Sequence, residues 1–318
     1  MTKSVKPHKN SQEFNSPSFF KMFRTLIKLT FKNKNYHPPK QLPTKEVDWS
    51  EFHKEQDCFI WFGHSSFILK LDGISILNDP VFGDHASNHK WLCPRFQPSI
   101  VKGADIPKVN VVLLSHNHYD HLDAPTIRDI CMKVDTFVTP VGNAEYLIEL
   151  GVPRYKIKEL RWNESVTINS LKITCTPAKH HSGRGLFDKN KALWGSWVIE
   201  SSKKKTFISG DTGYANHFKE IREKFGEMDW AFLESGQYNA LWPDHHMFPE
   251  ETAQAAIDLM AKKTIPIHWG AFSLSTHSWN DSIIKGSELF KKNNKEYLTP
   301  LIGELVTDQT IETSKWWT

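Results

Sequence analysis

The sequence predicts an α/β protein built from packed layers of strands and helices. Short apolar runs suited to strands alternate along the chain with amphipathic stretches suited to helices. Residues 64–80 and 194–213 also resemble each other, because each has a small polar opening, a strand, a charged turn, a second strand and a final aspartate. This likeness predicts two similar halves around a shared site, with convergent hairpin chemistry as the alternative explanation.

The first elements of the pattern follow one another closely. Three strands are predicted in succession, over residues 58–63, 66–71 and 74–79. The last two are joined by Asp72-Gly73, a typical hairpin turn. Residues 109–114 form a continuous apolar run, which indicates a strand buried on both faces. A helix is predicted over residues 124–134, since Asp123 can cap its first turn.

Strands and helices continue to alternate in the rest of the chain. Further strands are predicted over residues 136–140, 228–235 and 264–269. Further helices are predicted over residues 142–151, 215–226 and 249–263. The 318 residues, of which 39% are hydrophobic and 24% charged, allow one large domain or two modest ones with a sizeable core.

The N-terminal segment differs from the body in charge. Residues 1–45 contain ten Lys or Arg and one acid, which makes them about +9 and leaves the rest of the chain near −5. We therefore expect a basic arm and linker over 1–45 and a folded domain over 46–318, and we expect no nucleic-acid partner for the body. Basic and apolar residues over 19–32 alternate at helical spacing. That helix could lie on an anionic membrane surface or dock on the body or on a second subunit.

The four cysteines lie far apart without a Cys-x-x-Cys pair, which argues against a disulfide framework and against a cysteine zinc site. A reducing compartment fits them best. No apolar run approaches the roughly 20 residues of a membrane span, and the first residues do not read as a signal peptide. The expected location is cytoplasmic, with peripheral contact on the inner face of a membrane as the extension of the arm hypothesis.

Metal-capable side chains crowd into "LLSHNHYDHLD", residues 113–123, directly after the apolar run. His116 and His118 leave the same face of an extended segment, and Asp120 and His121 follow where a turn begins. Imidazole nitrogen and carboxylate oxygen suit zinc, and also iron or manganese. Satisfied histidines in an ordinary loop are the structural alternative.

Other candidate ligands follow apolar strands later in the chain. Each of them alone is more often structural than metal-bound, but their recurrence at strand ends favours a shared site. They are His180, His181, Asp211, His245, His246 and His268.

In this order, several motifs resemble the metallo-β-lactamase superfamily, and more closely its N-acylphosphatidylethanolamine phospholipase D branch. The motifs are "GHSSFIL", "LNDPVF", "SHNHYDHLD", "TPAKHH", "LWGSWVI", "SGDTGY", "HHMFPEE" and "IHWGAF". The resemblance covers roughly residues 59–272. It implies a four-layer αβ/βα sandwich with a dinuclear zinc site at one edge, for which manganese or iron are alternatives.

The resemblance also implies roles for particular residues. By motif, the ligands are His116, His118 and His180 for one zinc, Asp120, His121 and His268 for the other, and Asp211 as the bridge between them. His180 is preferred to His181, because it occupies the position of the family's histidine after the Thr-Pro pair. His246 is the candidate for proton transfer, and Asp211 is counted with it as catalytic. His64 is expected near the site in a supporting role.

The function that the resemblance implies is hydrolysis of a phosphodiester. Redox members of the superfamily usually have Glu where this chain has His118, so hydrolysis is favoured over electron transfer. The expected substrate is a phospholipid of the N-acylphosphatidylethanolamine type or another small phosphodiester or ester. A lactonase or small-molecule phosphodiesterase on the same fold is the nearest alternative, and a non-catalytic metal-binding module is another. A homodimer is compatible with the sequence. Four tryptophans (Trp194, Trp197, Trp242 and Trp269) could line an acyl channel, although core packing is their more common use.

Overall fold

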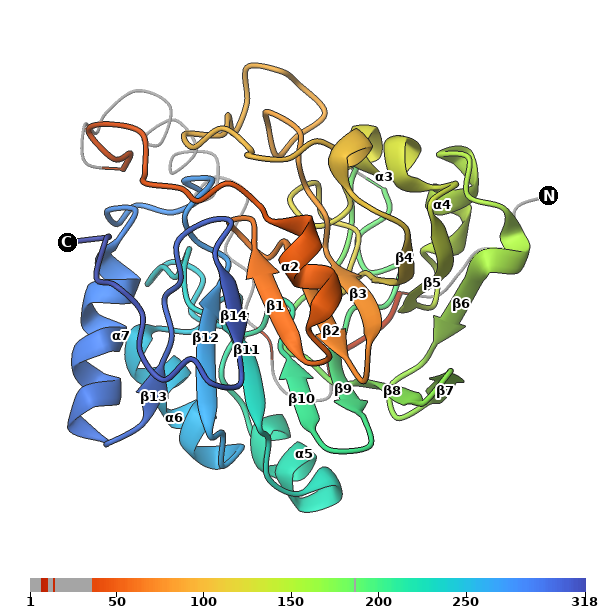
Figure 1. Ribbon diagram of the computed structural model, residues 1–318. Coiled ribbons are helices and arrows are strands. Elements are labelled where there is room, and N and C mark those ends of the chain that lie inside the picture. Colours follow the sequence, from red (N-terminus) through yellow and green to blue (C-terminus); the bar gives the residue numbers. More distant parts are fainter. Residues whose placement is uncertain (1–6, 11–13, 15–35, 186) are drawn as a thin grey trace.

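Two sheets facing each other, with helices on their outer sides, make up the protein (Figure 1). The structure is a computed structural model, and it describes residues 7–10, 14, 36–185 and 187–318. This arrangement confirms the predicted αβ/βα sandwich. The helix expected over 19–32 lies outside the described residues. In the part of the chain that is described, no helix is both long and apolar enough to cross a bilayer.

The first sheet has seven strands in the order β14-β1-β2-β3-β4-β5-β6. Neighbours from β14 to β3 are antiparallel, whereas β3 to β6 are parallel. The strands are β1 (Cys58–Trp61), β2 (Phe67–Leu71), β3 (Ile74–Asn78), β4 (Val109–Leu113), β5 (Val134–Pro140), β6 (Ile157–Leu160) and β14 (Leu305–Thr307).

The second sheet also has seven strands, in the order β13-β12-β11-β10-β9-β8-β7. Here β7 to β10 are antiparallel, and β10 to β13 are parallel. The strands are β7 (Ser165–Ile168), β8 (Leu171–Thr176), β9 (Ser196–Glu200), β10 (Lys205–Ile208), β11 (Trp230–Glu234), β12 (Lys263–Ile267) and β13 (Glu296–Tyr297).

The internal likeness of the sequence corresponds to equivalent hairpins in the two sheets. Residues 64–80 contain the hairpin β2–β3, and residues 194–213 contain β9–β10. Counted from β14 in the first sheet and from β7 in the second, each hairpin occupies the third and fourth places and is followed by a parallel strand, β4 or β11. The predicted construction from two similar halves is therefore confirmed.

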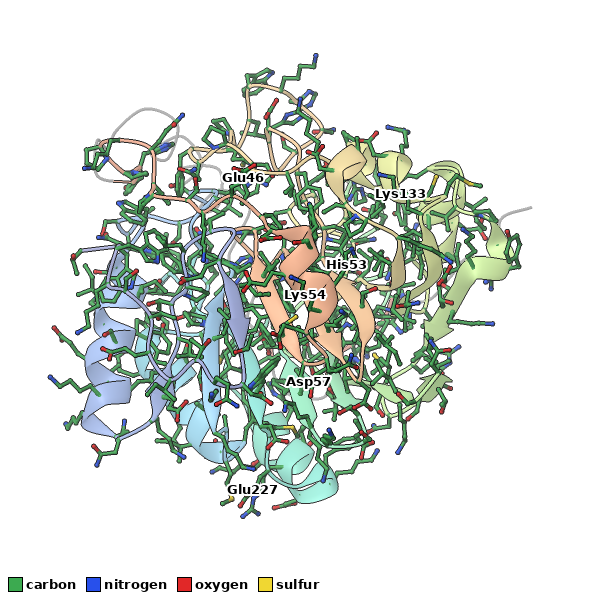
Figure 2. The ribbon with its side chains drawn as sticks, viewed as in Figure 1. Glu46, His53, Lys54, Asp57, Lys133 and Glu227 are labelled. Carbon is green, nitrogen blue, oxygen red and sulfur yellow. The ribbon has the colours of Figure 1, made fainter. Side chains whose placement is uncertain are left out.

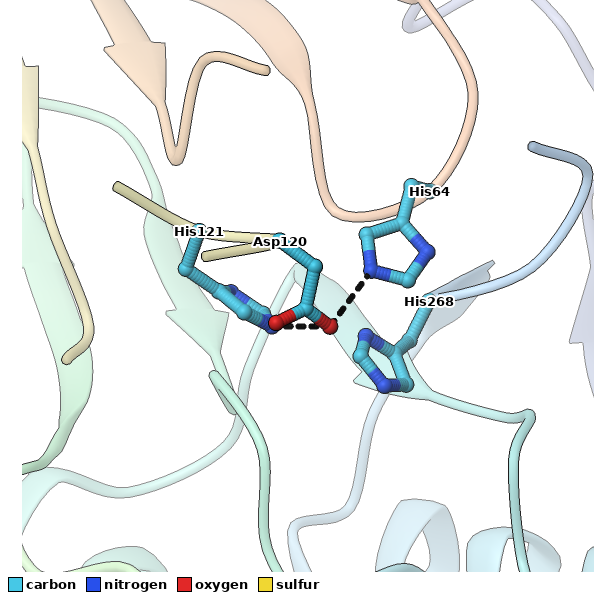
Figure 3. A group of neighbouring side chains, drawn as sticks. All are labelled: His64, Asp120, His121 and His268. Carbon is cyan, nitrogen blue, oxygen red and sulfur yellow. Dashed lines mark hydrogen bonds and ion pairs between the residues drawn. The ribbon is translucent and has the colours of Figure 1, made fainter. Parts of the chain in front are cut away.

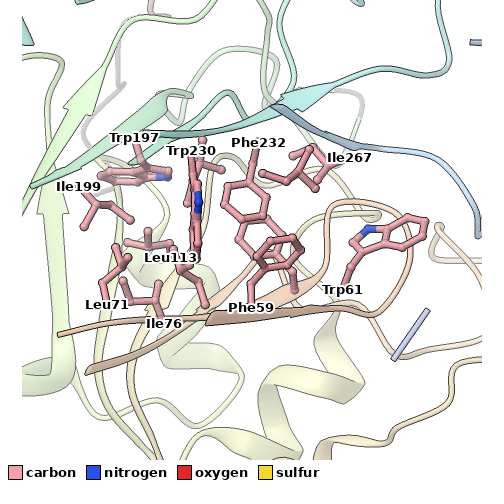
Figure 4. Packing of buried hydrophobic residues seen from close by; sticks show 14 of the residues in the cluster. Phe59, Trp61, Leu71, Ile76, Leu113, Trp197, Ile199, Trp230, Phe232 and Ile267 are labelled. Atoms are coloured by element: carbon pink, nitrogen blue, oxygen red, sulfur yellow. The ribbon is translucent and has the colours of Figure 1, made fainter. Parts of the chain in front are cut away.

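Aromatic and branched side chains from both sheets fill the space between them (Figure 4). The Phe232 ring of β11 stacks on Phe67 of β2 with centroids 4.2 Å apart, and it meets Phe59 of β1 edge-on at 5.0 Å. Trp197 and Trp269 belong to this core and are at most 1% exposed. Their low exposure favours core packing over the lining of an open channel, and Trp194 is likewise only 1% exposed.

Helices cover the outer face of each sheet. Apolar residues of α2 (Trp49–Lys54), α3 (Ala124–Ile130) and α4 (Ala144–Glu149) pack with the first sheet. Those of α5 (His217–Phe225), α6 (Pro249–Asp258) and α7 (Asp281–Lys292) pack with the second. Short 3₁₀ turns, η1 (Gly103–Asp105) and η2 (Arg154–Lys156), lie in the connections. Exposed charged side chains such as Lys54 on α2 and Glu227 after α5 lie on the outside (Figure 2).

Two predicted helices are shorter in the structure. The helix expected over 124–134 ends at Ile130, because β5 already begins at Val134. The helix expected over 249–263 ends at Asp258, and Met260 then has a φ of 51°, which reverses the chain before β12. The predicted cap of α3 is present, since the Asp123 side chain accepts a hydrogen bond from the Thr126 N–H.

The ring contacts of Phe232 predict its contribution to stability. We expect Phe232→Ala to lower the free energy of unfolding by about 3–5 kcal/mol, because it leaves a cavity between the two sheets. Denaturant unfolding followed by circular dichroism measures this. Phe187→Ala, at a position 86% exposed, is the matched control and should change little. Equal effects of the two substitutions would contradict the assigned core.

Candidate metal centre

The candidate ligands lie in loops that leave the ends of four strands. The loop after β4 carries His116, His118, Asp120 and His121, and the loops after β8, β10 and β12 carry one candidate each: His180, Asp211 and His268. These strands belong to both sheets, so the site is formed at one edge of the sandwich. Asp120 and His268, which are 148 positions apart in the sequence, are thereby brought within reach of one cation.

A close approach of two loops makes this convergence possible. Gly210 follows β10 with a φ of 57°, and a Cβ at this position would lie 2.7 Å from the Cβ of Ser115, which follows β4. A side chain would therefore push the two strand ends apart. Glycine at 210 allows Asp211 to sit beside the histidine-rich loop.

The first group of ligand atoms consists of three imidazoles and a carboxylate. His118 Nδ1 lies 2.7 Å from His116 Nε2 and 3.3 Å from His180 Nε2. Asp211 Oδ2 lies 3.8 Å from His116 Nε2 and 3.7 Å from His180 Nε2. All four ligand atoms lie within 4.8 Å of one another, which is compact enough for one ion.

The second group lies beside the first and is drawn in Figure 3. Asp120 Oδ2 is 3.6 Å from His121 Nε2 and 3.1 Å from His64 Nε2, and ligand atoms of these three residues and His268 all lie within 4.8 Å of one another. Asp211 is placed between the groups, with Oδ2 3.1 Å from His121 Nε2 and Oδ1 3.2 Å from His268 Nδ1. Asp211, which belongs to the first group, is therefore also close to two residues of the second group.

Burial keeps most of these imidazoles neutral. It lowers the pKa of His118 to about 4, and it lowers the pKa values of His116, His180 and His268 well below their usual range. Neutral imidazole is the form that binds a metal. Among the described residues, buried Asp211 Oδ1 and His268 Nε2 also have no hydrogen-bond partner. A divalent cation that accepts nitrogen and oxygen ligands fits this donor set.

His121 differs from the other histidines in its charge. Burial by itself lowers its pKa, but Asp211, Asp120 and Asp79 outweigh burial and raise the pKa well above the usual value. Its Nδ1 lies 2.9 Å from Asp79 Oδ2, and its Nε2 faces Asp211. Asp79 also accepts hydrogen bonds from the Ser115 N–H and hydroxyl, both at 2.7 Å. Asp79 thus holds the His121 ring with Nε2 toward the site.

Residues 245 and 246 close the site on the side of the second sheet. The carbonyl of His245 accepts a hydrogen bond from His180 Nδ1 at 3.1 Å, which leaves His180 Nε2 free for a ligand role. The His246 ring stacks on His268 with centroids 4.9 Å apart. His246 Nδ1 lies 3.6 Å from Glu234 Oε2, a fully buried carboxylate at the end of β11.

The protonation of His246 depends on Glu234. Burial lowers the pKa of His246, but the Glu234 carboxylate outweighs it and raises that pKa. Burial in turn raises the pKa of Glu234 to about 7. Glu234 also accepts a hydrogen bond from the Met247 N–H, which ties its position to the chain after His246. The pair can hold a proton next to the ligand groups.

Of the remaining sequence candidates, His64 belongs to the second ligand group, whereas His181 lies beside the first. His181 is not part of any ligand group, and its ring packs 4.6 Å from that of His118. His64, expected in a supporting role, reaches Asp120 directly. Two supporting residues were not predicted from the sequence: Asp79, which holds the His121 ring, and Glu234, which lies beside His246. The final aspartate of residues 64–80 was a signal for Asp79, and an acid near the end of the predicted strand 228–235 was a signal for Glu234.

Comparisons with known proteins agree with this geometry. The model of the beta-lactamase superfamily domain matches residues 75–269, which is more than half of the chain. An uncharacterized protein of Mycobacterium tuberculosis is 37% identical over 264 residues, covering 81% of this chain and 70% of its own. The N-acyl-phosphatidylethanolamine-hydrolyzing phospholipase D 1 of Caenorhabditis elegans is 31% identical over 302 residues, covering 86% and 84%.

Solved structures share the fold at low sequence identity. A possible metal-dependent hydrolase from Veillonella parvula has a TM-score of 0.64 and 15% identity, covering 80% of this chain and 100% of its own. An isothiocyanate hydrolase from Delia radicum gut bacteria has a TM-score of 0.62 and 19% identity, covering 79% and 98%. The chain therefore belongs to the metallo-β-lactamase superfamily as a metal-dependent hydrolase, with relatives in the N-acylphosphatidylethanolamine phospholipase D branch.

Proposed function

We propose that the protein is a phosphodiesterase of the phospholipase D type that acts on N-acylphosphatidylethanolamine-like lipids. The observation that carries the proposal is the placement of Asp211 between two adjoining ligand groups, which suits a dinuclear hydrolytic site. The choice of substrate is supported by the named activity of the relative in Caenorhabditis elegans. The products would be phosphatidic acid and an N-acylethanolamine.

Two zinc ions are the proposed cofactors, with manganese or iron as alternatives. Three ligands would hold one ion (His116, His118 and His180), three the other (Asp120, His121 and His268), and Asp211 would bridge them. Such a pair supplies a water of lowered pKa and stabilises negative charge on the phosphoryl oxygens. The chain's own groups set the conditions for this chemistry, because they are buried and held by hydrogen bonds before any ion arrives, and His180 among them is neutral.

His246 is the proposed proton donor to the leaving alcohol. Hydrolysis forms a bond from the oxygen of a water molecule to phosphorus and breaks the bond between phosphorus and the leaving oxygen, and that leaving oxygen needs a proton. His246 can supply it, because its raised pKa favours the protonated form and its ring lies against His268. Glu234 would hold the His246 ring in place and stabilise its charge.

Contact with a membrane is part of the proposal. The basic stretch over 19–32 would hold the protein on the inner face of an anionic membrane from the cytoplasm. Charge-reversal variants at Lys21, Arg24, Lys28 and Lys32 address this contact. Binding to anionic vesicles should weaken while hydrolysis of a soluble diester stays unchanged. Loss of vesicle binding and of soluble hydrolysis together would contradict a membrane role.

A substrate panel with metal analysis tests the proposed activity. The purified protein should bind about two zinc ions and hydrolyse an N-acyl phospholipid faster than a bis-aryl phosphate, with little action on a lactone. Asp211→Ala should lose metal and activity, whereas Asp135→Ala, at an exposed position, should retain both. Preference for the lactone would favour the lactonase alternative, and bound metal without turnover of any substrate would favour a binding module.

Metal binding should release a proton from His121. In the metal-free protein its raised pKa keeps it charged at neutral pH, whereas a ligand must be neutral, so filling the site displaces about one proton per chain. Release should disappear once the pH exceeds that raised pKa. A pH indicator or calorimetry in buffers of different ionisation enthalpy measures the released protons.

Asp79→Asn, which removes one carboxylate that raises the pKa of His121, should reduce the proton release at the same pH. Release that does not change with pH would contradict the assignment.

Glu234 and His246 should act as a unit. We expect Glu234→Gln and His246→Gln each to lower kcat by about 10–100-fold while zinc content stays unchanged, since neither residue is a proposed ligand. The double variant should be little worse than either single one, because each change disables the same proton donor. Steady-state kinetics with elemental analysis checks this, and additive losses would separate the two residues.

A further inference from the structure

Part of the N-terminal segment lies directly on the candidate metal centre. The His8 N–H donates to the carbonyl of Asn190 at 2.7 Å. The Asn10 side chain donates from Nδ2 to the carbonyl of His180 at 2.8 Å and accepts at Oδ1 from the His180 N–H at 3.1 Å. Both contacts fall on the loop of residues 177–195, which connects β8 to β9. The arm therefore reaches the loop that carries a proposed ligand.

The backbone of His180 depends on this contact. His180 is 1% exposed, so its N–H and carbonyl have little access to water. Within the described residues, Asn10 provides the hydrogen bonds of both groups. The preceding residue is fixed from the other side, because the Lys179 N–H donates to Thr212 Oγ1 at 2.8 Å and its carbonyl accepts from the Gly213 N–H at 2.9 Å. Buried backbone groups need such partners, so losing Asn10 would free the chain at His180.

The direction of the His180 side chain depends on the position of its backbone as well as on a hydrogen bond made by its ring. His180 Nδ1 donates to the carbonyl of His245, which directs Nε2 toward His118 and Asp211. Phe14 lies beyond these rings, with its centroid 4.6 Å from that of His245 and 6.0 Å from that of His181. The segment thus holds the ligand by its backbone and packs against the outer histidines.

We propose that Asn10 is a positioning residue of the metal centre. Its carboxamide holds the backbone of His180, so that the imidazole stays directed at the group formed with His116, His118 and Asp211. This inference rests on the proposed ligand role of His180. Its consequence is that the basic arm is not separable from the catalytic domain, because one of its residues supports a ligand.

Zinc affinity of full-length variants tests this inference. We expect Asn10→Ala to weaken zinc binding at one of the two sites by about 10–100-fold in competition with a chelator, as substitutions of residues behind a ligand typically do. Asn10→Asp keeps an acceptor for the His180 N–H but loses the donor to its carbonyl, so it should fall between Ala and Asn. The absorption spectrum of the cobalt-substituted protein should change in the same order.

Two controls separate positioning from general destabilisation. Lys9→Ala alters the same segment and Asn88→Ala removes an exposed asparagine, and both should bind zinc normally. The melting temperature of the metal-free protein should fall only slightly in the Asn10 variants and stay unchanged in the two controls, because the lost hydrogen bonds are local. Unchanged zinc affinity and cobalt spectrum in both Asn10 variants, with a wild-type protein that binds two zinc ions, would overturn the role of Asn10 and leave the proposed function intact. A wild-type protein that binds no metal would overturn both.

Discussion

The imidazole of His121 lies between two carboxylates that come from different sheets, and the site is arranged around this contact. Asp79 follows β3 of the first sheet and faces Nδ1, whereas Asp211 follows β10 of the second sheet and faces Nε2. Carboxylates buried this deeply are tolerated only near positive charge. In the metal-free protein the charge on His121 helps to meet that requirement, and it outweighs burial to hold the pKa values of Asp120 and Asp211 well below their usual range.

The fold makes this contact possible because it places the ends of β3 and β10, which are equivalent strands of the two sheets, next to each other. Asp79 and Asp211 are the final aspartates of the two similar hairpins, so the likeness between the halves of the sequence places one carboxylate on each side of the same ring. The aromatic core around Phe232 keeps the sheets face to face, and Gly210 lets their loops approach. Stability of the sandwich and geometry of the site therefore depend on the same packing.

Much of this arrangement could be predicted from the sequence. The order of strands and helices and the cluster over 113–123 indicated the fold class and a metal site, because hydrophobic periodicity and ligand spacing are local properties. The support given by Glu234 and Asn10 could not be predicted in this way. Glu234 acts on a residue in the following loop, and the contact of Asn10 spans 170 positions, so only the folded chain brings such partners together. The sequence likewise could not decide whether Trp197 and Trp269 pack in the core or line a channel, because their neighbours come from distant parts of the chain.

The pairing of β1 with β14 has a consequence for synthesis of the chain. β1 begins at Cys58, but its partner on one edge is made of residues 305–307. While the protein emerges from the ribosome, this apolar strand has an open edge until residues 305–307 have left the exit tunnel. Open edges of this kind are prone to pairing with other chains. The nascent polypeptide is therefore exposed to misassembly throughout the synthesis of residues 62–304, which contribute most of the hydrophobic core between the sheets.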